Sequence, residues 1–169
     1  MSEIYKTRMS WPVRVISILV LVVVLCLFGK ASSDLIHGAS KYSVYLYGGA
    51  MLLILIGFVW SWYYSAKELV LTENELIVVR RGKSISIPID QIKEVFPGSV
   101  YRSIRVFGSG GLFGYLGIFR NPEIGYFRAM AGDLSESFFV VTAKRKYLLS
   151  CKNHTELIDK LHIHVPEKL

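Results

Sequence analysis

The chain from Glu68 to Ile89 reads ELVLTENELIVVRRGKSISIPI, in which short apolar runs alternate with turn-forming residues. The runs 68–72 and 76–81 are rich in Val, Ile and Leu, and the acidic and Asn residues between them are typical of a β-hairpin. Residues 84–88 alternate polar and apolar side chains, as a half-buried strand does. This strand ends at Pro88, where a missing N–H is tolerated. The pattern extends into a fourth element at Ile89, Ile92 and Val95.

The last third of the chain predicts another hairpin and one short helix. Apolar runs at 138–142 and 147–150 flank a basic tip at 144–146. Residues 154–163 have the spacing of an amphipathic helix, and its apolar face carries Leu157, Ile158 and Leu161. Many short strands followed by one helix predict a small β-sandwich or open barrel, and we expect the helix to bury its apolar face against the open end.

Upstream of these strands lie two apolar runs that predict transmembrane helices. Thirteen of the sixteen residues from Val13 to Phe28 are Val, Ile, Leu or Phe. A span over about 11–29 is roughly 28 Å long as a helix, which is enough to cross a bilayer. The second run, 42–64, has no charged residue and carries Tyr and Trp at its two ends, as interfacial aromatic belts do. We therefore predict a transmembrane helical hairpin with a connection of about twelve residues.

The predicted topology places both termini in the cytoplasm. Cations are more frequent outside the hairpin than in the connection, where only Lys30 and Lys41 lie, and the positive-inside rule applies to such short flanks. A multi-pass integral membrane protein follows, with residues 1–66 forming the tail and spans and 67–169 a cytoplasmic β-domain. A cleavable signal peptide is the alternative for the first run, because small residues follow it at 31–33. The uninterrupted length of this run and the second span so soon after it favour a retained helix.

Composition narrows the classes of partner and chemistry. The 169 residues include 20 Lys and Arg against 13 Asp and Glu, a formal net charge of +7, and 52% are hydrophobic. This excess is small and interspersed, which argues against nucleic acid, whereas cations beside apolar segments suit an anionic membrane surface. The four histidines are dispersed and the two cysteines have no metal-ligand spacing, so we expect no catalytic residues, no metal and no cofactor.

Residues 98–132 form the least ordinary segment. They hold eight of the fourteen glycines, seven aromatic residues and four arginines, but no lysine. The glycine run at 108–114 lacks the third glycine of a dinucleotide fingerprint and the Lys-Ser/Thr of a P-loop, so nucleotide binding is not expected. Glycines among aromatic residues favour bulges and close strand crossings as the structural interpretation. The functional alternative is a face that contacts lipid or protein.

The candidate contact residues are the basic turns together with the arginines and rings of this segment: Arg80, Arg81, Lys83, Arg102, Arg105, Phe113, Tyr115, Arg120, Arg128, Lys144, Arg145 and Lys146.

The order of these features resembles the bacterial pleckstrin-homology-like (PH-like) domains that follow one or two transmembrane helices. The resemblance covers about residues 67–162 and rests on the hairpin at 71–76, the segments IPIDQI at 87–92 and GYLGIF at 114–119, the paired strands around Phe139 and Leu148, and the closing helix. It implies a strongly bent antiparallel sheet of about seven strands capped by a C-terminal helix. It also implies that the membrane is a bacterial inner or cell membrane. The first hairpin turn, 72–75, is acidic, which argues against phosphoinositide headgroup binding at that turn.

Three classes of function follow from these patterns. The leading interpretation is a membrane-anchored, non-catalytic interaction or scaffold module that binds a protein partner or self-associates. The alternative is an anionic-lipid-sensing domain that uses the basic turns and the segment 98–132. An enzyme or small transporter is the third class, and transport is disfavoured because neither span carries an ionisable residue away from its ends.

Overall fold

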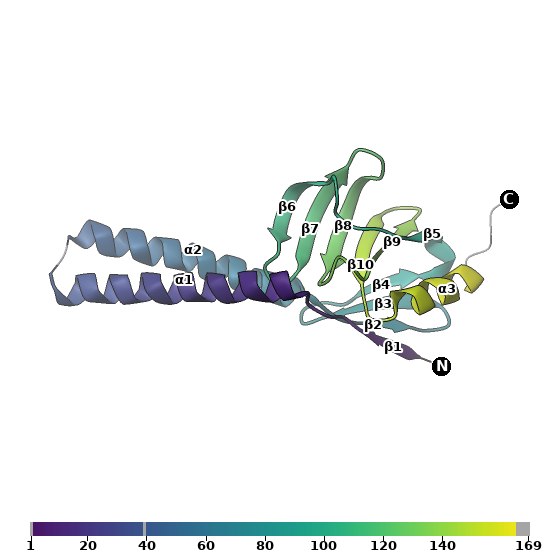
Figure 1. The fold of residues 1–169 in the computed structure, drawn as a ribbon, viewed down its shortest axis with the longest axis horizontal. Helices are drawn as coiled ribbons and strands as arrows, with labels where there is room; N and C mark the ends of the chain where they lie inside the picture. Colours follow the sequence, from purple (N-terminus) through teal and green to yellow (C-terminus); the bar gives the residue numbers. More distant parts are fainter. Residues whose placement is uncertain (1, 39, 165–169) are drawn as a thin grey trace.

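The computed structural model describes residues 2–38 and 40–164 and contains a helical pair and a β-rich domain (Figure 1). The helices are α1 (Trp11–Ile36) and α2 (Lys41–Tyr64), which run side by side. Helix α1 extends beyond the predicted end near residue 29, so the connection is far shorter than the twelve residues expected. An i,i+4 ion pair between Lys30 and Asp34, with Nζ and Oδ1 3.0 Å apart, lies in this extension and favours helix there.

The first sheet has four strands in the order β1-β2-β3-β4. Strands β2 (Ala66–Leu71), β3 (Glu75–Arg80) and β4 (Ile85–Pro88) are the predicted hairpin and its successor, and all three pair antiparallel. Strand β1 (Glu3–Lys6) was not predicted and pairs antiparallel with β2. Four residues before an apolar helix have no periodicity of their own, so only the open edge of β2 makes them a strand.

The second sheet has six strands in the order β5-β9-β10-β8-β7-β6. A short 3-10 helix, η1 (Ile89–Gln91), leads into it, and its strands are β5 (Ile92–Pro97), β6 (Ile104–Gly110), β7 (Tyr115–Asn121), β8 (Gly125–Ala131), β9 (Ser137–Thr142) and β10 (Lys146–Ser150). Its pairs are antiparallel except for β10 and β8, which are parallel. The described residues thus form ten strands in two open sheets, more than the seven of the resemblance, and one pair departs from the expected antiparallel arrangement.

The N-terminal segment connects the two sheets. Thr7 N–H donates to the carbonyl of Lys67 in β2 (N···O 3.2 Å), whereas the Lys6 carbonyl accepts from Lys152 N–H (3.0 Å) after β10. Ser10 N–H donates to the Gly132 carbonyl (3.0 Å) after β8, immediately before α1 begins. A division of the chain at residue 66 therefore separates β1 from the strand with which it pairs.

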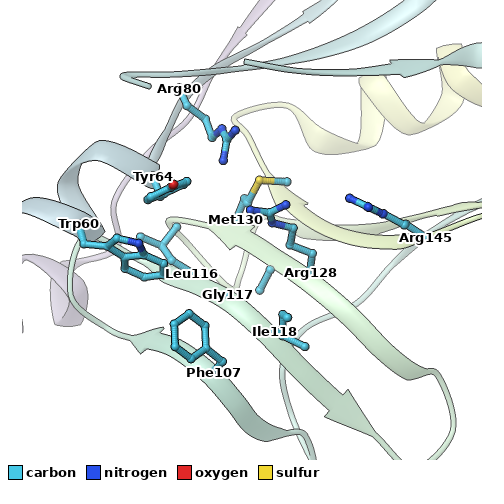
Figure 2. Close-up of a pocket in the computed structure, with 11 residues that line it drawn as sticks. Trp60, Tyr64, Arg80, Phe107, Leu116, Gly117, Ile118, Arg128, Met130 and Arg145 are labelled. Carbon is cyan, nitrogen blue, oxygen red and sulfur yellow. The ribbon is translucent and has the colours of Figure 1, made fainter. Parts of the chain in front are cut away.

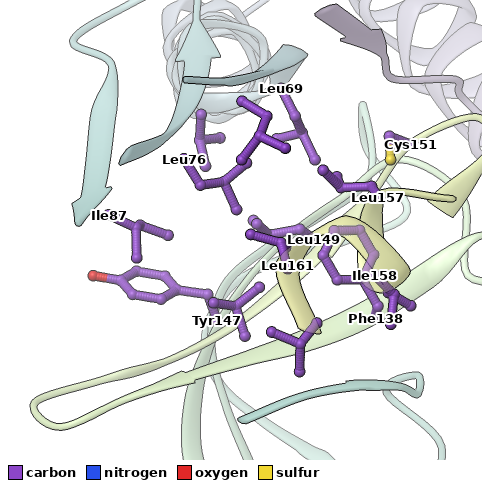
Figure 3. Packing of buried hydrophobic residues seen from close by; sticks show 14 of the residues in the cluster. Leu69, Leu76, Ile87, Phe138, Tyr147, Leu149, Cys151, Leu157, Ile158 and Leu161 are labelled. Atoms are coloured by element: carbon purple, nitrogen blue, oxygen red, sulfur yellow. The ribbon is translucent and has the colours of Figure 1, made fainter. Parts of the chain in front are cut away.

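The main hydrophobic core lies between the two sheets and is closed by helix α3 (His154–His164), as predicted (Figure 3). Leu157 and Leu161 are fully buried, and they pack among residues of both sheets such as Leu69 and Phe138. Alternate residues of β8, β9 and β10 form a smaller cluster on the opposite face of the second sheet, which contains Phe127, Phe139 and Leu148.

Gly108 of β6 and Gly117 of β7 lie where the two strands approach closely, which confirms the structural interpretation at these two positions. Gly108 and Gly117 are paired across the two strands and have φ angles of +114° and +126°. A Cβ atom on Gly117 would lie 2.1 Å from the Phe107 carbonyl oxygen, and one on Gly108 would lie 2.0 Å from that of Leu116. Only glycine permits both this φ and this approach.

Candidate functional site

The candidate site is a pocket of about 370 Å³ on the inner face of strands β6 to β8, where the second sheet extends beyond the first. The pairs Leu116–Met130 and Ile118–Arg128 point to this face from β7 and β8. Met130 is buried with the main core, whereas Ile118 is exposed, so the pocket continues the core outward toward solvent.

Helix α2 forms one wall of the pocket through its last two turns. The Trp60 ring lies edge-on to the Phe107 ring of β6, with centroids 5.7 Å apart, and it also contacts Tyr64 at 4.9 Å. Figure 2 shows these three rings on the side of the pocket where α2 ends. The site is therefore built jointly by the β-domain and the apolar helix.

Three arginines from three elements approach the same space (Figure 2). Arg80 lies at the end of β3, Arg128 on β8 and Arg145 in the β9–β10 turn. Burial lowers the pKa of the Arg80 guanidinium from its usual value, and the charge of Arg128 lowers it further. Within the described residues none of the three forms an ion pair with a carboxylate, and no acidic residue lines the pocket. The pocket is thus a cationic rim over an apolar floor.

Arg80 is held in place by its own turn. Its Nε atom donates to the Lys83 carbonyl (N···O 2.8 Å), a second guanidinium nitrogen donates to the same oxygen, and the guanidinium lies 5.4 Å from the centre of the Tyr64 ring. Arg128 is half-buried between neighbouring strands. Arg80 is therefore positioned before any ligand arrives, which lowers the entropic cost of binding.

The β6–β7 turn docks the domain onto the helices. Phe113, with φ +55°, places its ring edge-on to the Phe58 ring of α2 at a centroid distance of 4.8 Å. Its backbone N–H donates to Ser17 Oγ of α1 (3.1 Å), and that hydroxyl donates to the Val13 carbonyl one helical turn earlier. Because Ser17 and Phe58 each lie nearly two turns inside their helices, this turn reaches past the ends of the apolar segments.

The structure brings together only part of the candidate residues from the sequence. Arg80, Arg128 and Arg145 line the pocket, while Phe113 contacts the helices and Tyr115 packs against the smaller cluster. Arg81 lies over the Trp62 ring and donates to Ser65 Oγ, and Lys146 donates to the Ile124 carbonyl. The remaining candidates are exposed and outside the pocket: Lys83, Arg102, Arg105, Arg120 and Lys144.

Sequence reasoning did not assign the apolar half of the pocket. Trp60 and Tyr64 were interpreted only as an aromatic belt, and Leu116, Ile118 and Met130 were not singled out. The alternation along β7 and β8 was the available signal, because Leu116 and Ile118 lie on one face. This alternation does not show that β7 and β8 pair with each other.

The described residues give little support for a metal site, a reactive thiol or a site at the acidic turn. No group of three or more His, Cys, Asp or Glu side chains among them could hold a metal ion. Burial, with the charge of Glu136, raises the pKa of the Cys151 thiol to about 12, so this thiol is protonated and unreactive at neutral pH. The acidic turn at 72–75 does not line the pocket.

Comparison with family models gives one match, described as a bacterial PH domain, over residues 67–165. The match includes more than half of the chain and ends close to the limit of the resemblance noted from sequence. The chain belongs to the bacterial PH domain family. PH-like domains generally serve as interaction modules, and the order of two sheets followed by a C-terminal helix agrees with that assignment. No curated protein and no solved structure matched this PH domain protein.

Proposed function

We propose that this protein is a membrane-anchored, non-catalytic interaction module, in which α1 and α2 cross the bilayer and hold the PH domain against its cytoplasmic face. The observation that carries the proposal is the docking of Phe113 between the two helices. A domain tethered by a flexible linker would make no such contact. Here the domain is fixed to its anchor, so its pocket faces the place where the helices end.

The dimensions and exposure of the helices support the anchoring. At 1.5 Å per residue, α1 (26 residues) is about 39 Å long and α2 (24 residues) about 36 Å, against a hydrocarbon thickness of about 30 Å. Only 11% and 0% of their most apolar windows are buried. The core helix of a soluble protein would be mostly buried, whereas these surfaces are left for lipid.

The N-terminal strand supports the topology. Since β1 precedes α1 and pairs with β2 after α2, both lie at the same end of the helical pair. A signal peptidase that cleaved near residues 31–33 would remove this strand from the sheet. The same end carries a basic cluster beside the start of α1, which suits an anionic leaflet. Its members are Lys6, Arg8, Arg14 and Lys152.

Cysteine accessibility tests the anchoring and the topology together. His37 lies in the exposed connection of the helices and Lys144 in an exposed turn of the domain. In intact cells a membrane-impermeant maleimide should label His37→Cys, and it should label Lys144→Cys only after permeabilisation. Both variants are made in a Cys26→Ala background, because Cys26 is exposed on α1, whereas the native Cys151 is buried and can stay. Labelling of Lys144→Cys before permeabilisation, or release of the protein by alkaline carbonate, would contradict the proposal.

The lipid-sensing alternative remains a second candidate because of the arginine-lined pocket at the end of α2. It is compatible with anchoring, since a lipid can be the ligand of an anchored module.

A further inference from the structure

We propose that the pocket between α2 and strands β6 to β8 binds the phosphate-bearing headgroup of an anionic membrane lipid. This inference rests on the proposed anchoring of the helices. It assigns the ligand to a site away from the β2–β3 turn, which is acidic.

The first argument is the level of the pocket relative to the helices. Trp60 lies four residues before the end of α2, and Tyr64 is its last residue. Amphipathic rings at the end of an apolar span lie at the headgroup level of a bilayer. Phe107 of the domain packs against Trp60, so the β6 wall of the pocket lies at the same level. A lipid in the surrounding leaflet therefore reaches the pocket without leaving the membrane.

The second argument is chemical complementarity. Guanidinium groups form paired hydrogen bonds with phosphate oxygens, and a partly desolvated site strengthens such bonds. Arg80 and Arg128 are half-buried, close enough for the charge of one to affect the other, and without a carboxylate partner in the described chain. An anion between them relieves this repulsion. Burial lowers the pKa of the Arg80 guanidinium, and the charge of Arg128 lowers it further.

The third argument distinguishes a lipid from a free anion. Apart from its arginines, the pocket is lined by rings and aliphatic side chains such as Phe107, Ile118 and Met130. These three side chains form no hydrogen bonds with a hydrated inorganic phosphate, but they can pack against the glycerol and upper acyl region of a lipid. A volume of about 370 Å³ accommodates a headgroup but not a whole lipid, so the chains remain in the bilayer.

Native mass spectrometry of the full-length protein in detergent tests the assignment. The protein is titrated with phosphatidylglycerol and, separately, with zwitterionic phosphatidylcholine. We expect Arg80→Gln with Arg128→Gln to weaken phosphatidylglycerol binding at least tenfold. Phosphatidylcholine binding should weaken much less, because its choline cation offsets the attraction of its phosphate to the arginines. Arg102→Gln with Arg120→Gln removes the same charge from exposed positions outside the pocket, so we expect less than a twofold change.

A second variant distinguishes the loss of a binding site from a loss of folding. Ile118 is 43% exposed and faces the pocket from β7, paired with Arg128. Ile118→Glu keeps all the arginines and places a carboxylate beside them, so it should abolish tight phosphatidylglycerol binding while the protein keeps its melting temperature. Retention of tight binding in this folded variant would overturn the proposal.

The remaining outcomes separate the ligand sources. Equal weakening in the control pair would mean general surface attraction and would overturn the pocket assignment. Displacement of the lipid by millimolar inorganic phosphate would identify a free-anion site and would also overturn it. Binding of an acidic peptide that requires Arg80 and Arg128, without binding of phosphatidylglycerol, would point to a protein partner and would overturn the lipid assignment. Cysteine accessibility is unaffected by these results, so the anchoring can stand if the pocket assignment fails.

Discussion

At the residue scale, the φ angle of each glycine and its distance to neighbouring backbone decide whether a side chain fits there. Six described glycines have positive φ, but only some of them also face a neighbouring backbone. Gly114 faces the Ala131 carbonyl, and Gly117 faces that of Phe107, whereas a Cβ on Gly125 would meet no atom within 4 Å. The consequences of adding a methyl group therefore differ among glycines that look equivalent in the sequence.

Gly117→Ala should strongly destabilise the domain, because the new methyl group adds backbone strain and a contact of 2.1 Å with a carbonyl oxygen. We expect a loss of more than about 3 kcal/mol in the free energy of unfolding. Gly125→Ala, with φ +80° and open space, is the matched control and should lose about 1 kcal/mol. Chemical denaturation measures both values. Similar losses in the two variants would show that the close approach of β6 and β7 at Gly117 adds nothing to the cost of the substitution.

Cys151 should resist alkylation in the folded protein. Burial raises the pKa of its thiol from 9.0 to about 12, and the neighbouring charge of Glu136 adds to this shift. Iodoacetamide at pH 8 should therefore modify it readily only after unfolding. Fast modification of the native protein would contradict the buried position.

The same shift predicts a pH dependence of stability. The raised pKa means that the folded state holds the thiol proton more tightly than the unfolded state. Its contribution is therefore fully present below about pH 9 and is lost as the pH rises toward 12. Urea titrations between pH 8 and 11.5 should show a steeper loss of stability for the parent than for Cys151→Ala. Tyr5, whose pKa burial and Glu3 raise to about 12, contributes to both proteins alike.

At the element scale, α3 and β1 complete the β-domain from opposite ends of the chain. Helix α3 buries Leu157, Ile158 and Leu161 in the main core. Strand β1 adds Tyr5 to the same core, and Lys160 of α3 forms an ion pair with Glu3 (Nζ···Oε2 2.6 Å). This pair is partly exposed, so apolar burial rather than charge accounts for most of the stabilisation.

Leu157→Ala with Leu161→Ala should unfold or severely weaken the β-domain. Each truncation of a fully buried leucine costs about 2–5 kcal/mol, a large share of the stability of a small domain. Ile163→Ala, at a position that is 80% exposed on the same helix, should change stability by less than about 0.5 kcal/mol. If the double variant keeps its melting temperature but loses a binding activity, α3 is a docking device and not part of the core.

At the scale of the whole molecule, the domain needs the segment that precedes the helices. Residues 3–6 pair with β2, and Lys6 and Ser10 form backbone hydrogen bonds just after β10 and β8. Ser10 and Ser65 lie where the helical pair joins the domain. A fragment that begins after α2 lacks these contacts and leaves an open edge at β2.

A soluble fusion tests this dependence. Residues 2–10 joined by a short Gly/Ser linker to residues 65–169 should melt well above residues 65–169 alone, which we expect to aggregate through the open edge. Within the fusion, Tyr5→Ala should cost about 3 kcal/mol, because Tyr5 is 7% exposed. Ile4→Ala, at a position 62% exposed, is the control and should cost almost nothing. Equal melting temperatures with and without residues 2–10 would show that β1 is dispensable.

The sequence by itself determined the helical pair, the β2–β4 and β9–β10 hairpins, and α3. Each of these is a local property, since apolar length, alternation along a strand and helical spacing are written in neighbouring residues. The resemblance to PH-like domains rested on the order of the same elements, and the match over residues 67–165 confirms it.

Only the tertiary structure decided the site and the edges of the sheets. Arg80, Arg128 and Arg145 were three candidates among twelve, and nothing local distinguished them from the exposed Arg102 or Arg120. Arg145 is brought near Arg128 by the parallel pairing of β10 with β8, in which Tyr147 lies opposite Arg128. Arg80 is brought near them by the packing of the first sheet against the second in the main core. Strand β1 depends likewise on the edge of a sheet that forms more than sixty residues later. Long-range pairing energy selects among conformations that local propensity leaves open, and for this reason these features could not be derived from the sequence pattern.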